Sequence, residues 1–306
     1  MTVPKAAREP SAEGRAGIQA LAKRGSLGQP ARMDTGLAGK VVVVTGASGG
    51  IGSAIARRMA AEGARLVLHY RTGRERVASL AAGLGVESLL VRGELAREAD
   101  ARRLMASAVR RFGRIDTLVA NAGSWAPESA CIADISLRRW RATMDAVLTT
   151  AFLSVREFAR VVRWQGRGNA VLVASTAGIF GEAGHADYAA AKSAMAQGLV
   201  RTLKNEFARL APHTADYCGG RVNAVCPGWT VVPRNAGKLS DAATVRRVTS
   251  TMALPQIGRP EDMANAVAFL ASDVLARHVT GQALVVAGGM EGRLLWEDDE
   301  VEPAWA

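Results

Sequence analysis

Cysteine is scarce in this sequence, and its placement excludes several classes of protein. The 306 residues include three cysteines, Cys131, Cys218 and Cys226, and none lies in a paired, zinc-binding spacing. An odd, scattered set argues against a disulfide framework and favours a reducing, cytoplasmic compartment. The four histidines form no ligand set either, so we expect no metal site.

Long apolar runs and internal repeats are also missing. The longest apolar runs, such as Val41–Val44 and Ala283–Ala287, fall far short of the ~20 residues that a membrane helix needs. No collagen, heptad or solenoid period is visible. Hydrophobic residues make up 49% of the chain and charged residues 22%, which excludes wholesale disorder. We therefore expect a globular protein with no membrane partner.

Acidic residues are the minority among the charged side chains. The chain has 39 Lys and Arg against 28 Asp and Glu, a formal net charge of +11. The basic residues are spread along the whole chain and form no block of five or more, so we do not expect a nucleic-acid partner. A basic exterior that attracts an anionic cofactor or substrate is the favoured interpretation.

The two ends differ in composition from the middle of the chain. Residues 1–37 are rich in Ala, Gly, Arg, Lys and Pro and have little apolar periodicity, which predicts a flexible N-terminal extension. Residues 293–306 form an acidic C-terminal tail. We expect one domain over residues 38–292.

Short apolar runs alternate with amphipathic segments throughout that domain. Seven strands are expected, at Val41–Thr45, Arg65–Tyr70, Ser88–Val91, Thr117–Ala120, Ala170–Ala174, Val222–Val225 and Leu284–Val286. Helices are expected between them, at Ile51–Ala61, Arg74–Ala82, Glu98–Phe112, Leu137–Arg163 (as one or two helices), Ala186–Leu210 and Pro260–Ala271. This order predicts an α/β protein with a doubly wound parallel seven-stranded sheet, a Rossmann fold. Its ligand crevice should lie at the carboxyl ends of the strands.

A glycine-rich loop joins the first strand to the first helix. In Thr45–Gly52, Gly46 permits a tight turn, Gly50 lets the backbone approach a diphosphate, and Gly52 lets the helix pack on the strand. The free N–H groups of the helix suit phosphate. The predicted cofactor-binding residues here are Gly46, Ser48, Gly49, Gly50, Ile51 and Gly52.

The end of the second strand bears on the choice of cofactor. His69-Tyr70-Arg71-Thr72 contains no carboxylate to hold ribose hydroxyls, whereas Arg71 and Thr72 suit a 2′-phosphate. NADP is therefore favoured over NAD. The alternative is that Arg71 is a solvated loop residue.

Three residues are candidates for proton chemistry. Tyr188 and Lys192 lie four residues apart and therefore on one helix face, where an ammonium favours the phenolate form of a tyrosine. Such a phenol can pass protons to and from a substrate oxygen. Ser175 follows the fifth strand, and its hydroxyl could hold that oxygen.

The motifs, taken in order, resemble those of short-chain dehydrogenases/reductases. They are Thr45-Gly-x-x-x-Gly50-x-Gly52, Asn121-Ala122-Gly123, Ser175, Tyr188-x-x-x-Lys192 and Pro227-Gly228. The likeness spans Leu37 to Gly292 and is greatest to members related to 3-oxoacyl-carrier-protein reductases. It implies that Tyr188 is the catalytic acid/base, that Lys192 lowers its pKa and binds the nicotinamide ribose, and that Ser175 orients the substrate. It also implies a homotetramer or homodimer and further cofactor contacts at Glu94, Leu95, Asn121, Ala122, Gly123, Pro227, Gly228 and Thr230.

The chain departs from that family at several positions. Val147 stands where the family usually has an asparagine that serves a proton relay, and valine offers no hydrogen bond. Val232 replaces a frequent threonine and Ala287 a frequent aspartate. Pro212–Gly220 looks like an insertion, which we expect to be a surface loop.

The predicted substrate side is aromatic. Candidate positions are Trp125, Ile179, Phe180, His185 and Trp229, which would favour a hydrophobic or ring-bearing carbonyl compound unless several are core residues. The stretch Thr230–Pro255 is expected to close as a lid. The sequence thus predicts an NADPH-dependent carbonyl reductase with a small-molecule substrate. Two alternatives are an alcohol dehydrogenase working oxidatively and a cofactor-binding protein with little catalysis because of Val147.

Overall fold

The computed structural model describes residues 33–290 and residue 292. The predicted acidic tail, and the predicted extension up to residue 32, lie outside the described residues. Of the described helices, none is long and apolar enough to cross a membrane.

Seven parallel strands form one sheet, which confirms the predicted fold class. Their order is β3-β2-β1-β4-β5-β6-β7, and every neighbouring pair is parallel. The strands are β1 (Val41–Val44), β2 (Arg65–Tyr70), β3 (Ser88–Arg92), β4 (Thr117–Ala120), β5 (Asn169–Val173), β6 (Arg221–Pro227) and β7 (Ala283–Val286). The strand order reverses at β1 and β4, so their carboxyl ends diverge and leave the crevice in which this fold binds ligands.

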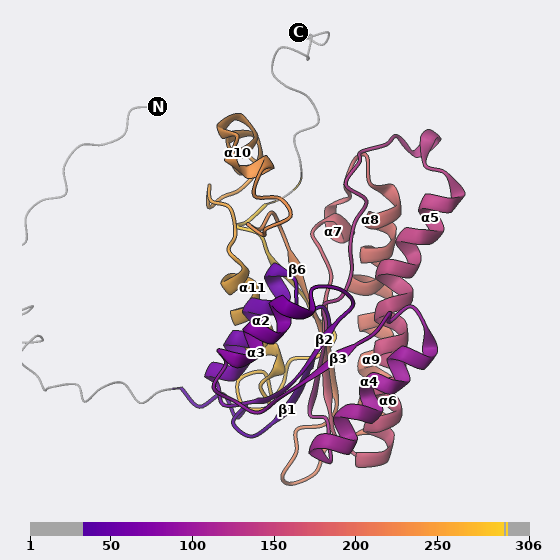
Figure 1. The fold of residues 1–306 in the computed structure, drawn as a ribbon, viewed down its shortest axis with the longest axis vertical. Helices are drawn as coiled ribbons and strands as arrows, with labels where there is room; N and C mark the ends of the chain where they lie inside the picture. The colour runs from indigo at the N-terminus through magenta and orange to yellow at the C-terminus, as the bar shows by residue number, and fades with distance from the viewer. Residues whose placement is uncertain (1–32, 291, 293–306) are drawn as a thin grey trace, which may run out of the picture. The chain divides into compact units, whose positions relative to one another are not determined.

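Helices cover both faces of the sheet (Figure 1). One face packs against α2 (Gly50–Ala61), α3 (Arg74–Ala82) and α11 (Pro260–Ala271). The other packs against α4 (Glu98–Phe112), α6 (Thr150–Gln165) and α9 (Val200–Leu210). All four residues of β1 are fully buried, as expected of a strand covered on both sides. Smaller helices lie near the carboxyl ends of the strands: α5 (Leu137–Met144), α7 (Ala177–Phe180), α8 (Ala186–Ser193) and α10 (Ala242–Thr249), with short turns η1 (Ile132–Asp134) and η4 (Lys238–Ser240).

Two of the long predicted helices contain a π-helical segment. The segment η2 (Asp145–Thr149) joins α5 to α6, and η3 (Ala194–Leu199) joins α8 to α9. A π turn inserts one extra residue and shifts the face that the following helix presents. Val147 lies in the middle of η2 and is fully buried.

The described core includes residues that the sequence assigned to the N-terminal extension. Leu37 is 2% exposed and packs with the α2 side of the core. The carbonyl of Thr35 accepts a 2.6 Å hydrogen bond from the Ser272 hydroxyl, and the Thr35 hydroxyl donates to a Glu62 carboxylate oxygen at 2.8 Å. The packed domain therefore includes Thr35 to Leu37.

A buried arginine ties β6 to the turn after α11. The guanidinium of Arg221 is 3% exposed and donates to the carbonyls of Leu270, Ala276 and Ser272, each at 3.0 Å. It also pairs with Asp273 at 3.0 Å. Burial of a charge is tolerated here because the donors meet fixed acceptors.

The Pro212–Gly220 segment is anchored rather than loose. Tyr217 is 7% exposed, and its hydroxyl accepts a 2.8 Å hydrogen bond from the Gly168 N–H and donates to the Gly168 carbonyl. Burial raises the pKa of Tyr217 to about 12, so the phenol stays neutral. Residues 212–216 of this loop are exposed, as predicted, whereas Gly219 and Gly220 are buried.

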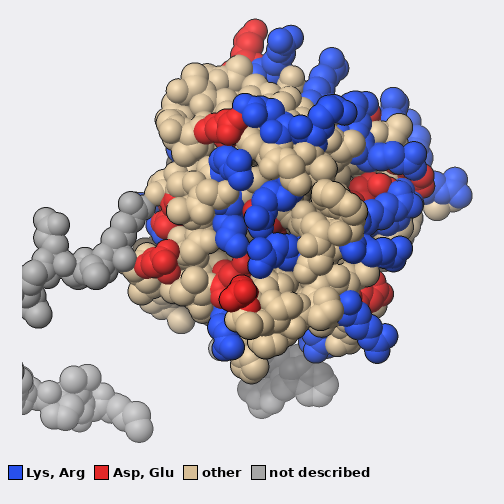
Figure 2. Space-filling view, turned by 90° about the horizontal axis from the view of Figure 1, so that it is seen from below, with Lys and Arg blue, Asp and Glu red and all other residues tan. Residues whose placement is uncertain are grey.

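Basic side chains are distributed over the surface. Figure 2 shows the face at the bottom of Figure 1, where Lys and Arg are interspersed with uncharged and acidic residues. This agrees with the even distribution of arginine along the sequence.

Candidate active site

A cleft of about 630 Å³ lies at the carboxyl ends of the strands. It brings together most of the predicted site residues: Gly46, Ser48, Gly49, Gly50, Ile51, Gly52, Asn121, Gly123, Trp125, Ser175, Tyr188, Lys192, Pro227, Gly228, Trp229 and Thr230. Others do not line it: Arg71, Thr72, Glu94, Leu95, Ala122, Ile179, Phe180 and His185. Several lining residues were not predicted as site residues: Arg76, Ser124, Val173, Ala174, Thr176, Ala177, Glu182, Val232, Pro233, Arg234 and Asn235.

The glycine loop is packed so tightly that Gly52 has no room for a side chain. Gly46 adopts a left-handed φ of 68°, and a Cβ at Gly52 would overlap its carbonyl oxygen. No side chain caps the start of α2 at Gly49, so the first N–H groups of the helix are available. The residues present therefore fit the diphosphate of a dinucleotide, which needs a close backbone approach and a helix N-terminus.

Asn121 and Ala122 fasten the end of β4 to this loop. Both backbone N–H groups donate to the Thr45 hydroxyl at 2.9 Å. The Asn121 side-chain amide donates to the Thr45 carbonyl at 2.9 Å and to the Gly46 carbonyl at 3.4 Å. These bonds hold the cofactor side of the cleft in one geometry.

His69 supports the loop from behind, a role that the sequence did not reveal. Its Nδ1 accepts a 3.2 Å hydrogen bond from the Gly46 N–H, and its Nε2 donates to the Gly93 carbonyl at 3.1 Å. Burial lowers the pKa of His69 to about 4, which keeps the ring neutral and lets Nδ1 accept. A histidine inside a buried strand carries no distinct sequence signal for such a role.

Arg71 and Glu94 form an ion pair at the ends of β2 and β3. Their side chains meet at 3.1 Å, and that of Arg71 is 57% exposed. The Glu94 N–H donates to Asp100 at 2.7 Å, which fixes the turn after β3. Leu95, the predicted adenine neighbour, is buried in the core. Arg71 is thus accessible, but a carboxylate already contacts it.

The side chains of Ser175 and Tyr188 both line the cleft. The Ser175 Oγ accepts from the Ala177 N–H at 3.1 Å, which orients the hydroxyl. Burial raises the pKa of Tyr188, while the Ser175 hydroxyl and the charge of Arg234 act against this rise. The phenol is therefore protonated at neutral pH and can donate.

Lys192 lies one helical turn after Tyr188. Its Nζ donates to the Val173 carbonyl at 2.7 Å and lies 5.7 Å from the centroid of the tyrosine ring. The side chain is almost fully buried, and this burial lowers the pKa of Lys192 to about 8. The ammonium is therefore mostly charged at neutral pH and favours the phenolate of Tyr188 once its proton has left.

Val147 and the Lys192 ammonium both lie near Gly123. A Cβ placed on Gly123 would lie 3.9 Å from Lys192 Nζ, 3.9 Å from Val147 Cγ2 and 3.7 Å from the Ala146 carbonyl oxygen. At this position Val147 contributes a methyl group, which offers no hydrogen bond. The polar atom contributed here by η2 is a backbone carbonyl.

The predicted aromatic wall is present in part. The Trp125 ring stacks on His185 with centroids 4.2 Å apart, and it meets Tyr188 edge-on at 5.7 Å. His185 is 6% exposed and donates from Nε2 to the Ala126 carbonyl, so it supports Trp125 from behind. Phe180 is 40% exposed and lies outside the cleft.

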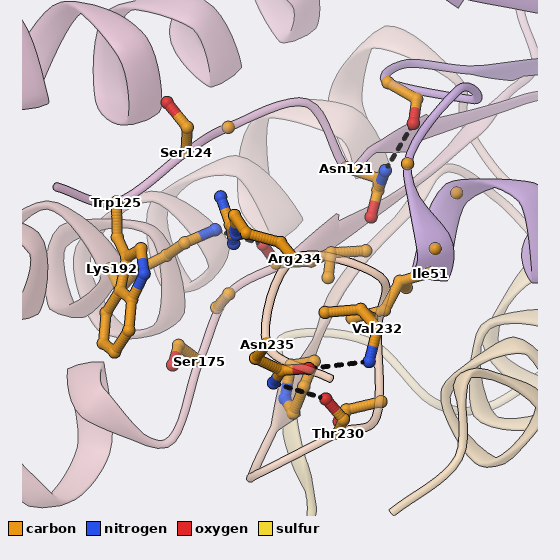
Figure 3. Close-up of a pocket in the computed structure, with 18 of the residues that line it drawn as sticks. Ile51, Asn121, Ser124, Trp125, Ser175, Lys192, Thr230, Val232, Arg234 and Asn235 are labelled. Carbon is orange, nitrogen blue, oxygen red and sulfur yellow. Dashed lines mark hydrogen bonds between the residues drawn. The ribbon is translucent and has the colours of Figure 1, made fainter. Parts of the chain in front are cut away.

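The lid rests directly on the glycine loop. A Cβ on Gly50 would lie 2.8 Å from Val232 Cγ1 and 3.1 Å from Pro233 Cδ. A bridge between Thr230 and Gly258 holds the base of this segment. Figure 3 shows Val232, Arg234 and Asn235 over the cleft, opposite Ser175 and Lys192.

Comparison with known proteins agrees with this geometry. A family model described as enoyl-(acyl carrier protein) reductase matches residues 46–291. The chain is 36% identical over 258 residues to an L-rhamnose 1-dehydrogenase (NAD(P)(+)) of Azotobacter vinelandii, covering 82% of this chain and 96% of that protein. It is 32% identical over 259 residues to a 3-oxoacyl-[acyl-carrier-protein] reductase of Synechocystis, covering 84% and 98%. The crystal structure of a levodione reductase superposes with a TM-score of 0.74 at 28% identity, covering 81% of this chain and 96% of that one.

Proposed function

This chain belongs to the short-chain dehydrogenase/reductase family of NAD(P)-using oxidoreductases, and from that premise we propose that it is an NADPH-dependent carbonyl reductase. The substrate in this proposal is a ketone or 3-oxoacyl compound, which is reduced to the alcohol. The observation that carries the proposal is that Ser175, Tyr188 and the buried Lys192 line one cleft together with the glycine loop.

The side chains present supply the acid–base part of this reaction. The glycine loop would hold the dinucleotide cofactor, which when bound would supply a hydride to the carbonyl carbon. The Ser175 hydroxyl holds the carbonyl oxygen, and Tyr188 donates its phenolic proton to that oxygen. The Lys192 ammonium stabilises the resulting phenolate, which then regains a proton from solvent.

The preference for NADPH rests on Arg71. Its exposed guanidinium lies at the end of β2, where this fold places the adenosine ribose, and it suits a 2′-phosphate. Glu94 opposes that preference because it already pairs with Arg71 and would repel a phosphate. We propose that the phosphate displaces Glu94 from Arg71.

Catalysis can be tested by removing the phenolic hydroxyl. In a panel of ketones assayed with NADPH, we expect Tyr188→Phe to lose about 100- to 10,000-fold in turnover while still binding NADPH. Tyr217→Phe is a matched control, since that buried phenol lies outside the cleft, and it should keep its activity. Turnover that survives in Tyr188→Phe would contradict the assigned role.

Two other functions have specific support. The same groups serve alcohol oxidation, so an alcohol panel with NADP⁺ belongs in the assay. The apolar Val147 beside Lys192 favours a cofactor-binding protein with weak catalysis. NADPH binding without turnover across both panels would favour that alternative.

The assembly is proposed to be a homotetramer or homodimer in a cytoplasmic compartment. Large apolar side chains are exposed on α6 at Phe152, on α11 at Phe269 and on β7 at Leu284. Such side chains suit subunit interfaces. Sedimentation of the wild type and of Phe152→Lys would test whether the α6 face forms a subunit interface.

A further inference from the structure

The turn that carries Arg234 is tied down over the cleft. The Asn235 side-chain oxygen accepts from the Val232 N–H at 2.8 Å, and its amide donates to the Thr230 carbonyl at 2.8 Å. The Asn235 N–H donates to the Val232 carbonyl at 3.0 Å and closes the turn. Arg234 is therefore presented from a fixed backbone rather than from a loose loop.

The guanidinium of Arg234 faces the reacting end of the cleft. It lines the same cavity as Tyr188 and Lys192, and Figure 3 shows it directed towards Lys192. Its positive charge opposes the rise in the pKa of Tyr188 and adds to the lowering of the pKa of Lys192. Within residues 33–290, no hydrogen bond or ion pair engages this guanidinium.

The wall of the cleft opposite the lid is aromatic, and the charged side chains that line the cleft are mostly cationic. Trp125, backed by its stacking on His185, lies across from the lid and meets the Tyr188 ring edge-on. The charged residues described in the lining are Arg76, Lys192 and Arg234, with Glu182 as the carboxylate among them. The cleft thus combines a flat apolar surface with an excess of positive charge.

An arginine in this position selects for an anionic group. A guanidinium donates two parallel hydrogen bonds to a carboxylate, and such charge-assisted bonds are among the strongest in proteins. The cofactor phosphates already have donors in the glycine loop and a candidate in Arg71. Arg234 instead lies beside the proton donor, where the substrate's own substituents would lie.

We infer that Arg234 determines specificity and that the substrate is a ring-bearing or otherwise apolar oxo acid. Its carboxylate pairs with Arg234, its apolar body lies against Trp125, and its ketone oxygen lies between Ser175 and Tyr188. This inference rests on the proposed function, whose substrate class it narrows.

The test compares acids with their own esters. We would measure kcat/KM with NADPH for 4-oxocyclohexanecarboxylate, 3-acetylbenzoate and their methyl esters, in the wild type, Arg234→Gln and Arg234→Lys. Arg246→Gln is the matched control, because Arg246 is exposed on α10 outside the cleft. Cofactor affinity would be followed in each variant by NADPH fluorescence.

The wild type should prefer the acids, and Arg234→Gln should lose about 10- to 100-fold on the acids while the esters change by less than about 3-fold. Arg234→Lys should be intermediate, because an ammonium cannot form the paired bonds. Arg246→Gln should match the wild type. Equal losses on acids and esters together with weaker NADPH binding would assign Arg234 to the cofactor and overturn the inference.

Calorimetry separates failure of this inference from failure of the proposed function. Cyclohexanecarboxylate titrated into NADP⁺-loaded protein should bind the wild type and lose about 10-fold or more in affinity to Arg234→Gln. Reduction of the esters without any preference for the acids would overturn the inference and leave the reductase function intact. If no ketone is reduced but the acid binds through Arg234, the reductase function fails and the anion site stands.

Discussion

The glycine loop and the lid contact each other at Gly50 and Val232, yet they are held by different means. The loop is fixed by backbone geometry and by hydrogen bonds to the half-buried Asn121 and the buried His69. The lid is largely exposed, and the Asn235 side chain and the bridge to Gly258 hold it in place. The loop therefore tolerates almost no substitution. Side chains of the lid can be substituted, and such substitutions would change which substrate is accepted.

The sharpest test of this contrast exchanges one glycine in each region for alanine. Gly52→Ala should destabilise the protein by about 3 kcal/mol and abolish measurable NADPH binding, because the new methyl group overlaps the Gly46 carbonyl. Gly237→Ala in the lid has open space and a helical φ of −63°, so it should change stability by less than about 0.5 kcal/mol. Urea unfolding and NADPH fluorescence would measure both. Similar effects of the two substitutions would erase the distinction.

Low pH should destabilise the glycine-loop side of the protein because His69 becomes protonated. The pKa of His69 is about 4 in the folded protein against 6.5 for a free histidine, so the unfolded state binds more protons between these values. The free energy of unfolding should therefore fall as the pH drops from 6.5 to 4, by on the order of 3 kcal/mol. Urea titrations at pH 7 and 4.5 would measure this loss.

A variant of His69 isolates its share of the acid response. His69→Asn keeps an acceptor for the Gly46 N–H but does not titrate, so its stability should fall less over the same pH range. His213→Asn, at an exposed histidine, should follow the wild type. Parallel pH profiles for the wild type and His69→Asn would refute this account.

Substitutions of Arg71 and of Glu94, which form one ion pair, should shift the cofactor preference in opposite directions. Arg71→Asp should weaken NADPH binding about 10-fold more than NADH binding, because it replaces an attractive charge with a repulsive one. Glu94→Gln should strengthen NADPH binding by about 3-fold, a small change because the pair is exposed. Dissociation constants for both nucleotides would decide, and equal losses for the two nucleotides would remove Arg71 from the phosphate site.

The smallest effect is expected from loosening the lid. Asn235→Ala removes the two side-chain bonds that fix the turn, so KM for the ketone should rise about 3- to 10-fold while NADPH affinity stays unchanged. Asn205→Ala, at an exposed position on α9, should leave both constants at the wild-type values. A parallel loss of NADPH affinity in Asn235→Ala would show that the lid belongs to the cofactor side.

The contrast between the glycine loop and the lid also explains which features could be predicted from the sequence. The sheet was predictable because each strand is a short apolar run, of which the fully buried Val41–Val44 is the clearest. Ser175, Asn121 and the glycine loop follow the carboxyl ends of strands, and parallel strands bring those ends to one edge. Local patterns and topology were enough to bring these residues into one cleft.

Features that depend on tertiary contacts were not predictable. Arg234 sits in a polar, exposed stretch, and its direction comes from bonds made by Asn235. The π segments keep the apolar spacing of a helix, so η2 and η3 leave no pattern to detect. Leu37 lies among residues of low periodicity and is buried because α2 and its neighbours pack around it.

The contact between Gly50 and the Val232–Pro233 edge has a kinetic consequence. Gly50 begins α2, where its amide would face the diphosphate of a bound nucleotide, and it also lies against Val232 and Pro233 of the lid. A nucleotide arriving second would have to lift a cover already closed on the other ligand. We therefore expect ligand addition to be compulsory-ordered, with nucleotide first on and last off. Product inhibition should then be competitive between NADPH and NADP⁺, and noncompetitive between alcohol and ketone.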